Sequence, residues 1–387
     1  MEESRIKTEL ELYIHIPFCV RKCAYCDFLS GVDNEENKES YVNALIQEIK
    51  QYEQFHGQYV VSTIFIGGGT PSLLTKQQIK RIFEALHHVF EISKEAEITI
   101  EANPGTVSKE KLDMYRMCGV NRISFGLQST NNEELKLLGR IHTYEEFLES
   151  YYMARECGFE NINIDIISAI PKQTLSSWEQ TMQNVLSLSP EHISAYSLIV
   201  EEGTPFANMY GEGAPNEADL PSEEEERKIY YRTKELLTEN GYQQYEISNY
   251  AKHGKACRHN MGYWKRKEYL GIGLGSASLL NDMRYHNTDD MSFYLANSRR
   301  PELLRQDLHV LSVEEQMEEF MFLGLRMVEG VSKKDFEKCF GRSIEVCYEK
   351  QLKKLQKEEL LEIKDDKIML TEYGIDVSNY VLSEFIM

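Results

Sequence analysis

Short apolar runs alternate with longer amphipathic segments along the first 200 residues, and this alternation limits the possible fold more than any other feature. The apolar runs have the length of strands and cover 12–18, 61–67, 97–103, 122–128, 161–170 and 192–200. Several of the segments between them begin at Ser or Thr and end at Gly, as helices commonly do. Because strands that alternate with helices form parallel sheets, the sequence predicts a six-stranded, incompletely closed α/β barrel.

Most of the predicted strands end in polar or glycine-rich segments. These ends carry 17–19 (PFC), 67–71 (GGGTP), 101–104 (EANP), Gln128 and Asp165. In parallel α/β barrels the active site lies at the carboxyl ends of the strands. We therefore expect a single mouth to which successive strands each contribute residues.

The pattern changes towards the C-terminus. Segment 242–278 has few helix signals and many aromatic residues, and helical patterns return from about residue 302. A strand–turn–strand pattern follows around Asp365 and Asp366. We predict a barrel domain over 1–300 and a mostly helical, winged-helix-like domain over 301–387. Many winged-helix domains bind DNA, but 302–387 holds 12 basic and 19 acidic residues, so DNA binding is not expected here.

Composition excludes several classes of partner. The chain of 387 residues has a formal net charge of -20, which disfavours nucleic acid and anionic membrane surfaces. We find no apolar stretch of the roughly 20 residues that a transmembrane helix needs, and no signal-peptide pattern at the N-terminus. Five of the eight cysteines are scattered and three are clustered, a pattern that favours a reducing cytoplasm and one metal site.

The three clustered cysteines carry the strongest chemical signal. Cys19, Cys23 and Cys26 form a C-x3-C-x2-C pattern. Zinc sites commonly join two pairs of cysteines, and this chain offers no second pair. Iron–sulfur clusters take cysteine thiolates at such short spacings. Three thiolates can hold three irons of a [4Fe–4S] cluster, which leaves the fourth iron open to a ligand from outside the protein.

This loop resembles the hallmark of the radical S-adenosylmethionine superfamily. The sequence GGGTP at 67–71 is similar to the glycine-rich motif of the same superfamily. The resemblance implies a partial (β/α)6 barrel with the cluster loop at 13–30. It also implies that the open iron binds the amino and carboxylate groups of S-adenosylmethionine.

A closer resemblance is to the coproporphyrinogen III oxidase-like branch, whose Tyr-x-His-Ile-Pro-Phe-Cys pattern appears at 13–19. His15 in this pattern either lies near the cluster or orients the cysteine loop, and we favour the second role. The resemblance implies contacts to S-adenosylmethionine from residues on the cluster loop and the strand ends: Tyr13, Tyr25, Gly68, Gly69, Thr70, Glu101, Gln128, Arg140 and Asp165.

Two members of this branch remain as hypotheses. The oxidase carries an additional cysteine two residues after the third, where this chain has Phe28, and a longer N-terminal extension. The HemW-type haem chaperones carry the signature His-Asn-x-x-Tyr-Trp, which appears at 259–264. This second resemblance implies haem as a further ligand. It would place His259 on the iron and Tyr263 and Trp264 against the porphyrin. The alternative is that His259 and Trp264 pack against the barrel and have a structural role.

We favour a haem chaperone that binds the cluster, S-adenosylmethionine and haem, and passes haem to acceptor haemoproteins. The alternative is a radical enzyme that acts on a porphyrinogen. Because the cofactor mouth is intact, the sequence does not decide whether the chain is an enzyme. The resemblance also admits an electron donor, either a small-molecule reductant or a flavodoxin- or ferredoxin-type protein. The acceptor and the oligomeric state do not follow from the sequence.

Overall fold

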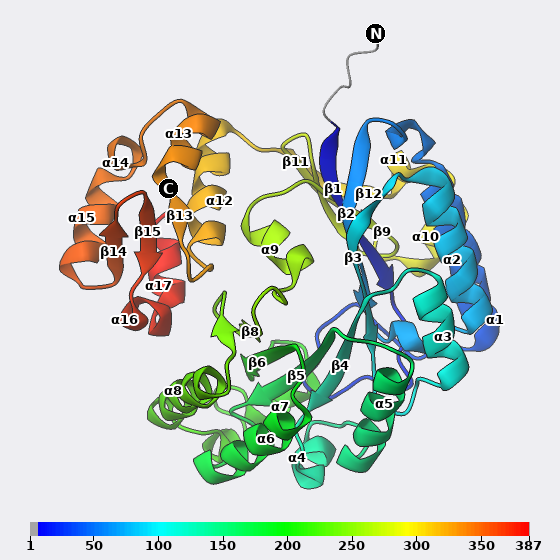
Figure 1. Ribbon diagram of the computed structural model, residues 1–387, viewed down its shortest axis with the longest axis horizontal. Coiled ribbons are helices and arrows are strands. Elements are labelled where there is room, and N and C mark those ends of the chain that lie inside the picture. The colour runs from blue at the N-terminus through cyan, green and yellow to red at the C-terminus, as the bar shows by residue number, and fades with distance from the viewer. Residues whose placement is uncertain (1–6, 387) are drawn as a thin grey trace.

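The computed structural model describes residues 7–386, so residues 1–6 and 387 of the predicted domains lie outside the described part. Six parallel strands lie side by side in sequence order (Figure 1). They are β1 (Thr8–Ile16), β2 (Tyr59–Gly68), β3 (Ile92–Ala102), β4 (Arg122–Gln128), β5 (Ile162–Ser168) and β6 (His192–Ser197). The helices between them are α1 (Glu35–Lys50), α2 (Lys76–Val89), α3 (Lys109–Met117), α4 (Asn132–Leu137), α5 (Tyr144–Glu156) and α6 (Leu175–Leu188). The predicted α/β architecture is confirmed.

Successive side chains of β1 point alternately towards the helices and towards the barrel interior. Leu12 and Ile14 are fully buried in the main hydrophobic core. Tyr13, between them, lines a cavity inside the barrel. Successive side chains of a strand point to opposite faces, so the core lies between sheet and helices and the interior of the barrel is left for polar groups.

The sheet is longer than the sequence indicated. Within residues 7–386 it has twelve strands, in the order β12-β11-β10-β9-β1-β2-β3-β4-β5-β6-β8-β7. The added strands are β7 (Gln243–Gln244), β8 (Asn249–Ala251), β9 (Tyr269–Ile272), β10 (Ala277–Leu280), β11 (Met283–Asn287) and β12 (Arg305–Val310). Most of them span two to five residues, too short for a period-2 pattern to stand out. In the described chain β12 and β7 do not pair, so the barrel is incompletely closed, as predicted.

Five more helices accompany these strands: α7 (Pro205–Tyr210), α8 (Glu223–Glu239), α9 (Arg258–Trp264), α10 (Met291–Asn297) and α11 (Pro301–Leu304). Helix α9 carries the His-Asn-x-x-Tyr-Trp signature in a segment where few helix signals were expected. Figure 1 shows α9 between the sheet and the C-terminal helices.

The C-terminal region has a hydrophobic core of its own, with Met321, Phe336 and Phe385 among its fully buried members. Its helices are α12 (Val313–Gly324), α13 (Lys333–Phe340), α14 (Ile344–Cys347), α15 (Glu349–Lys357), α16 (Glu372–Asp376) and α17 (Ser378–Ser383). A small sheet joins β13 (Val331–Ser332), β15 (Lys367–Leu370) and β14 (Leu361–Lys364). The expected strand–turn–strand is the β14–β15 hairpin, whereas the winged-helix likeness and the boundary at residue 300 stay predictions.

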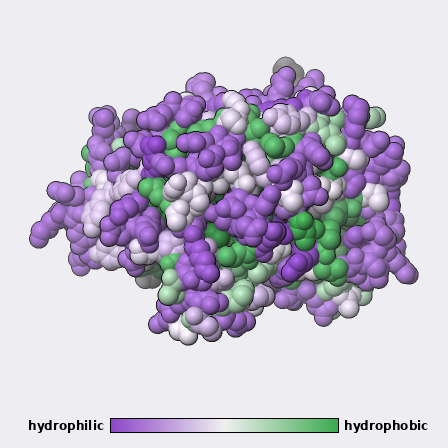
Figure 2. All heavy atoms as spheres, turned by 90° about the horizontal axis from the view of Figure 1, so that it is seen from below, coloured by the Kyte–Doolittle hydropathy of each residue, from purple (hydrophilic) through white to green (hydrophobic). Residues whose placement is uncertain are grey.

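The surface seen in Figure 2 is mostly hydrophilic. The hydrophobic residues on it form separate patches. Across residues 7–386 we find no helix that is long and apolar enough to span a bilayer.

Candidate functional site

The cluster loop leaves the end of β1 and returns beside it. The Cys19 N–H donates to the Gly31 carbonyl and the Gly31 N–H to the Pro17 carbonyl, each at 2.9 Å. The Ala24 N–H donates to the Leu138 carbonyl at 3.1 Å, which ties the loop to the end of α4. All three cysteines are partly exposed and line a cavity of about 150 Å³ at the barrel mouth.

Two polar side chains reach the cysteine sulfurs. The Thr70 hydroxyl lies 3.7 Å from the Cys19 Sγ, and Arg140 Nη1 lies 3.5 Å from the Cys23 Sγ. Burial raises the pKa of the Cys26 thiol. In residues 7–386 no three His, Cys, Asp or Glu side chains are spaced to hold a single metal ion. The donors at this mouth are cysteine thiols, and cysteine thiolates are the ligands that hold iron–sulfur clusters.

The glycine-rich turn packs directly against the start of the cluster loop. Gly68 has a φ of +113°, and a Cβ there would lie 2.5 Å from Cε1 of His15. A Cβ at Gly69 would lie 2.6 Å from the Phe18 carbonyl oxygen. The two glycines are therefore required for the close approach of β2 to the loop, apart from any contact with a cofactor.

His15 orients the cluster loop, as predicted. Its Nε2 lies 2.8 Å from the Leu29 carbonyl oxygen, and its Nδ1 lies 3.1 Å from the Tyr13 hydroxyl. Burial lowers the pKa of His15, so the imidazole is neutral at physiological pH. A neutral ring with both nitrogens engaged holds the distal part of the loop over the end of β1.

Two carboxylates face each other across the mouth. Glu101 accepts the Gly68 N–H at 3.1 Å, and Asp165 accepts the Ser124 hydroxyl at 3.0 Å and the Asn163 amide at 2.8 Å. Burial, together with repulsion from Asp165, raises the pKa of Glu101 to about 8. Burial likewise raises the pKa of Asp165. A ligand that donates hydroxyl hydrogens or carries positive charge would stabilise both carboxylates in their ionised form.

Arg140 joins the cysteine loop to the strand ends. Its Nη2 donates to the Asn103 Oδ1 and to the Gly126 carbonyl, both at 2.7 Å. Asn103 in turn donates to the Thr70 hydroxyl at 2.7 Å. The Nε of Arg140 is buried and, among the described residues, has no hydrogen-bond acceptor. An unsatisfied guanidinium donor at this depth suits an anionic group of a bound ligand.

All but one of the residues expected to contact S-adenosylmethionine line this mouth cavity, together with the three cysteines. The exception is Tyr13, which lines a neighbouring cavity of about 210 Å³ inside the barrel. The interior cavity shares Glu101, Ser124 and Asp165 with the mouth. Asn103 was not singled out from the sequence, although it lies in the strand-end segment 101–104 that pointed to the mouth.

His259 is held firmly inside the barrel. Its Nδ1 lies 2.7 Å from the Thr63 hydroxyl and its Nε2 lies 2.9 Å from the Tyr263 hydroxyl. The residue is 1% exposed, and burial followed by the charge of Arg122 lowers its pKa to about 3. Iron ligation by His259 would have to replace one of these two hydrogen bonds. Ligation by this residue stays a prediction.

Tyr263 lies one helical turn after His259 on the same face of α9, and Trp264 is the next residue on that helix. The Tyr263 ring meets the Tyr269 ring edge-on at 4.6 Å, and the Arg326 guanidinium lies 4.4 Å from the centre of the Trp264 ring. The signature thus brings three side chains to one short helix but directs them to different surroundings.

Comparison with known proteins identifies the family. Residues 13–185 match the radical SAM superfamily, and residues 311–377 match the HemN C-terminal domain. The heme chaperone HemW of Bacillus subtilis is 38% identical over 97% of this chain and 98% of its own length. The chain belongs to the HemW family of radical SAM proteins. HemW of Lactococcus lactis is 37% identical over 97% of this chain and 97% of its own length.

A solved structure outside the HemW family has a similar fold. The coproporphyrinogen III oxidase HemN of Escherichia coli, described as a radical SAM enzyme, matches with a TM-score of 0.86 at 27% identity. The match covers 98% of this chain and 90% of that protein. The HemW family and HemN therefore share one scaffold, and side chains rather than the fold must separate them.

Proposed function

We propose that this protein is a haem chaperone that binds a [4Fe–4S] cluster, S-adenosylmethionine and haem, and delivers the haem to acceptor haemoproteins. The observation that carries the proposal is the extent of its similarity to proteins named heme chaperone, at 35–38% identity over 97% of the chain. This range includes the aromatic segment and the C-terminal region as well as the cofactor mouth.

The residues of the mouth fit the proposed cofactors. Cys19, Cys23 and Cys26 would hold the cluster, and the unsatisfied Nε of Arg140 supports an anionic group beside it. Glu101 and Asp165 would accept hydrogen bonds from the hydroxyls of S-adenosylmethionine, as acidic residues do for the ribose of dinucleotides. When bound, the cluster would supply one-electron reducing chemistry beside S-adenosylmethionine, so an electron donor is part of this proposal. A location in the cytoplasm is also part of it.

Position 28 distinguishes the chaperone from the oxidase. Phe28 is 63% exposed and lines the mouth, at the position where the oxidase is expected to carry an additional cysteine. An exposed phenyl group offers no thiolate to metal or substrate. Decarboxylation of coproporphyrinogen is therefore the second candidate function, favoured only by the shared scaffold.

The test begins with anaerobic reconstitution of the cluster in the full-length chain. Haem is then titrated while the Soret band is followed in the wild type, in His259→Ala and in Phe28→Ala. A parallel sample receives coproporphyrinogen III, S-adenosylmethionine and reductant. We expect stable haem binding and no protoporphyrinogen. Turnover of coproporphyrinogen without stable haem binding would reject the proposal.

A further inference from the structure

One arginine inside the barrel is buried without an anionic partner. Arg122 is the first residue of β4 and is 2% exposed. Its Nε has no hydrogen-bond acceptor, and among residues 7–386 its guanidinium forms no hydrogen bond or ion pair. A buried charge without a partner is costly, and an arginine cannot avoid this cost by losing its proton. Arg122 therefore marks a site that suits an anion.

The acidic groups around Arg122 already accept hydrogen bonds from other residues. Glu97 and Asp165 act on Arg122 through their charges, but neither forms an ion pair with it. Glu97 accepts the backbone N–H groups of Arg258 and His259 at 2.9 and 3.2 Å. Asp165 accepts a hydroxyl hydrogen bond from β4 and an amide hydrogen bond from its own strand, β5. The guanidinium is thus left for a ligand.

Arg122 lines the interior cavity of about 210 Å³. Ser124, two residues further along β4, lines both this cavity and the mouth. The two side chains lie on the same face of the strand. Because a strand rises about 3.3 Å per residue, Arg122 lies about 7 Å further from the mouth than Ser124. A ligand bound to Arg122 would therefore lie deeper in the barrel than the cofactor.

The charge and the size of the interior cavity limit the class of ligand. Arg122 is the one arginine or lysine among the described residues that line it, and His259 is neutral because burial lowers its pKa. A dianion would leave one negative charge unpaired beside Glu101 and Asp165, which line the same cavity. The volume is below the roughly 300 Å³ at which typical small-molecule sites begin. A small anion with a single charge fits these limits.

We propose that the interior cavity binds a small monocarboxylate, whose carboxylate accepts hydrogen bonds from the planar guanidinium of Arg122. Its aliphatic part would face Tyr13 and Phe65, two cavity-lining rings that stack with their centres 6.4 Å apart. Haem is not involved in this binding, so the proposal stands or falls separately from the proposed function.

Butyrate is the probe, because it has one carboxylate and a short aliphatic chain. Arg122→Met removes the guanidinium, whereas Ser194→Leu fills the cavity and keeps Arg122. Ser194 lines the cavity and is 2% exposed. Arg299→Met and Ser176→Leu are the matched controls, since both residues are exposed. Equal cluster absorbance and circular dichroism of the reconstituted full-length proteins verify that the variants fold, and Ser194→Leu carries the test if Arg122→Met does not.

Thermal unfolding is followed in sodium butyrate, sodium sulfate and sodium chloride at equal ionic strength, and calorimetric titration gives the Kd for butyrate. We expect butyrate alone to raise the Tm of the wild type and of both controls. Arg122→Met and Ser194→Leu should raise the Kd at least about tenfold, as expected for the loss of a charge-assisted hydrogen bond. Absence of stabilisation by butyrate, equal stabilisation by sulfate, or wild-type affinity in either cavity variant would overturn the proposal.

Discussion

The mouth differs in construction from the aromatic cavity lined by Tyr263, Trp264, Tyr269 and Leu323, which we call the seam. The mouth is assembled from the ends of consecutive strands, with backbone groups and charged side chains that the barrel topology brings together. The seam is assembled from β1, β9–β11, α9 and α12, and α12 belongs to the C-terminal region with its separate hydrophobic core. A site made by one continuous sheet is rigid, whereas a site between two cores can change width when the contacts that join them yield.

The largest expected effect separates the two sites chemically. Replacing Cys19, Cys23 and Cys26 together by alanine removes every thiolate from the mouth, so we expect complete loss of the iron–sulfur absorbance after reconstitution. The same variant should bind protoporphyrin IX with unchanged affinity, since none of the three residues lines the seam. Iron and sulfide analysis checks the first result and fluorescence titration the second. Loss of porphyrin binding in this variant would mean that the two sites are not independent.

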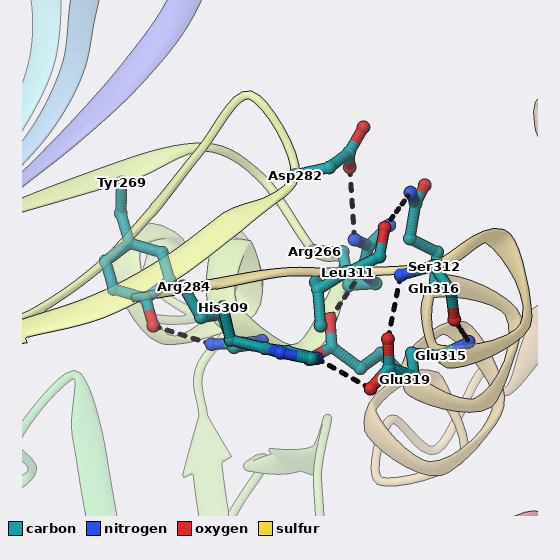
Figure 3. Close-up of polar contacts among 10 residues, drawn as sticks. All are labelled: Arg266, Tyr269, Asp282, Arg284, His309, Leu311, Ser312, Glu315, Gln316 and Glu319. Atoms are coloured by element: carbon teal, nitrogen blue, oxygen red, sulfur yellow. Dashed lines mark hydrogen bonds and ion pairs between the residues drawn. The ribbon is translucent and has the colours of Figure 1, made fainter. Parts of the chain in front are cut away.

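The next largest expected effect is a loss of stability at the junction, where α12 of the C-terminal region contacts the barrel (Figure 3). Glu319 is 7% exposed and pairs with both Arg266 and Arg284, so Glu319→Ala leaves two guanidinium groups without their shared acceptor. We expect a loss of about 3 kcal/mol in the free energy of unfolding, because a partly buried pair that loses one partner retains an uncompensated charge.

Denaturant unfolding measures this loss, and Glu349→Ala is the control. Glu349 forms an exposed pair with Lys353, so its removal should cost far less than the removal of Glu319. Equal losses in the two variants would mean that the junction is no stronger than a surface ion pair.

A third prediction concerns the pH dependence of stability. Burial raises the pKa of Glu11 to about 8 from its usual 4.5, and both of its carboxylate oxygens lack hydrogen-bond partners among the described residues. The folded chain therefore binds more protons than the unfolded chain between these values, and stability falls as pH rises through this window. For this one group the slope reaches about 1.4 kcal/mol per pH unit.

Glu11→Gln removes the proton that produces this slope. Its free energy of unfolding should exceed that of the wild type by more at pH 8 than at pH 5, as measured by urea titration at both values. Glu110→Gln is the control, because Glu110 is exposed. A parallel pH dependence in wild type and Glu11→Gln would contradict the prediction.

The smallest expected change in stability comes from an exposed ion pair of the same junction. Lys265 and Glu329 are about half exposed, so Lys265→Gln should change the free energy of unfolding by about 0.5 kcal/mol or less. Added salt should reduce the difference further, since water and ions screen such a pair. A loss as large as that of Glu319→Ala would show that the whole rim, and not one buried glutamate, holds the two cores together.

The mouth could be predicted from the sequence because each of its parts is local. Strand-end segments such as 67–71 and 101–104 carry their polar residues directly after an apolar run, and parallel topology alone brings such ends to one edge. Even so, the requirement for glycine at Gly68 became clear only when His15 was found beside it.

The seam could not be predicted in this way. Tyr269, Arg284 and Leu323 lie on three elements whose docking depends on tertiary contacts, and strands of four or five residues give no reliable pattern. The hydrogen bond between His259 and Thr63 could not be predicted either, because Thr63 lies far from α9 along the chain. Sequence reasoning therefore found the signature on α9 but not the surroundings of its three side chains.

The position of β1 has a consequence for how this protein is made. Strand β1 comes first among the described strands but lies in the middle of the sheet, and Tyr13 pairs with Phe65 on one side and with Gly271 on the other. Pairing across such a long stretch of chain is slow to form, so β1 is completed only after β9 has been synthesised. The loop that bears the three cysteines follows β1 directly. Its final shape is therefore set only after β9 has joined the sheet.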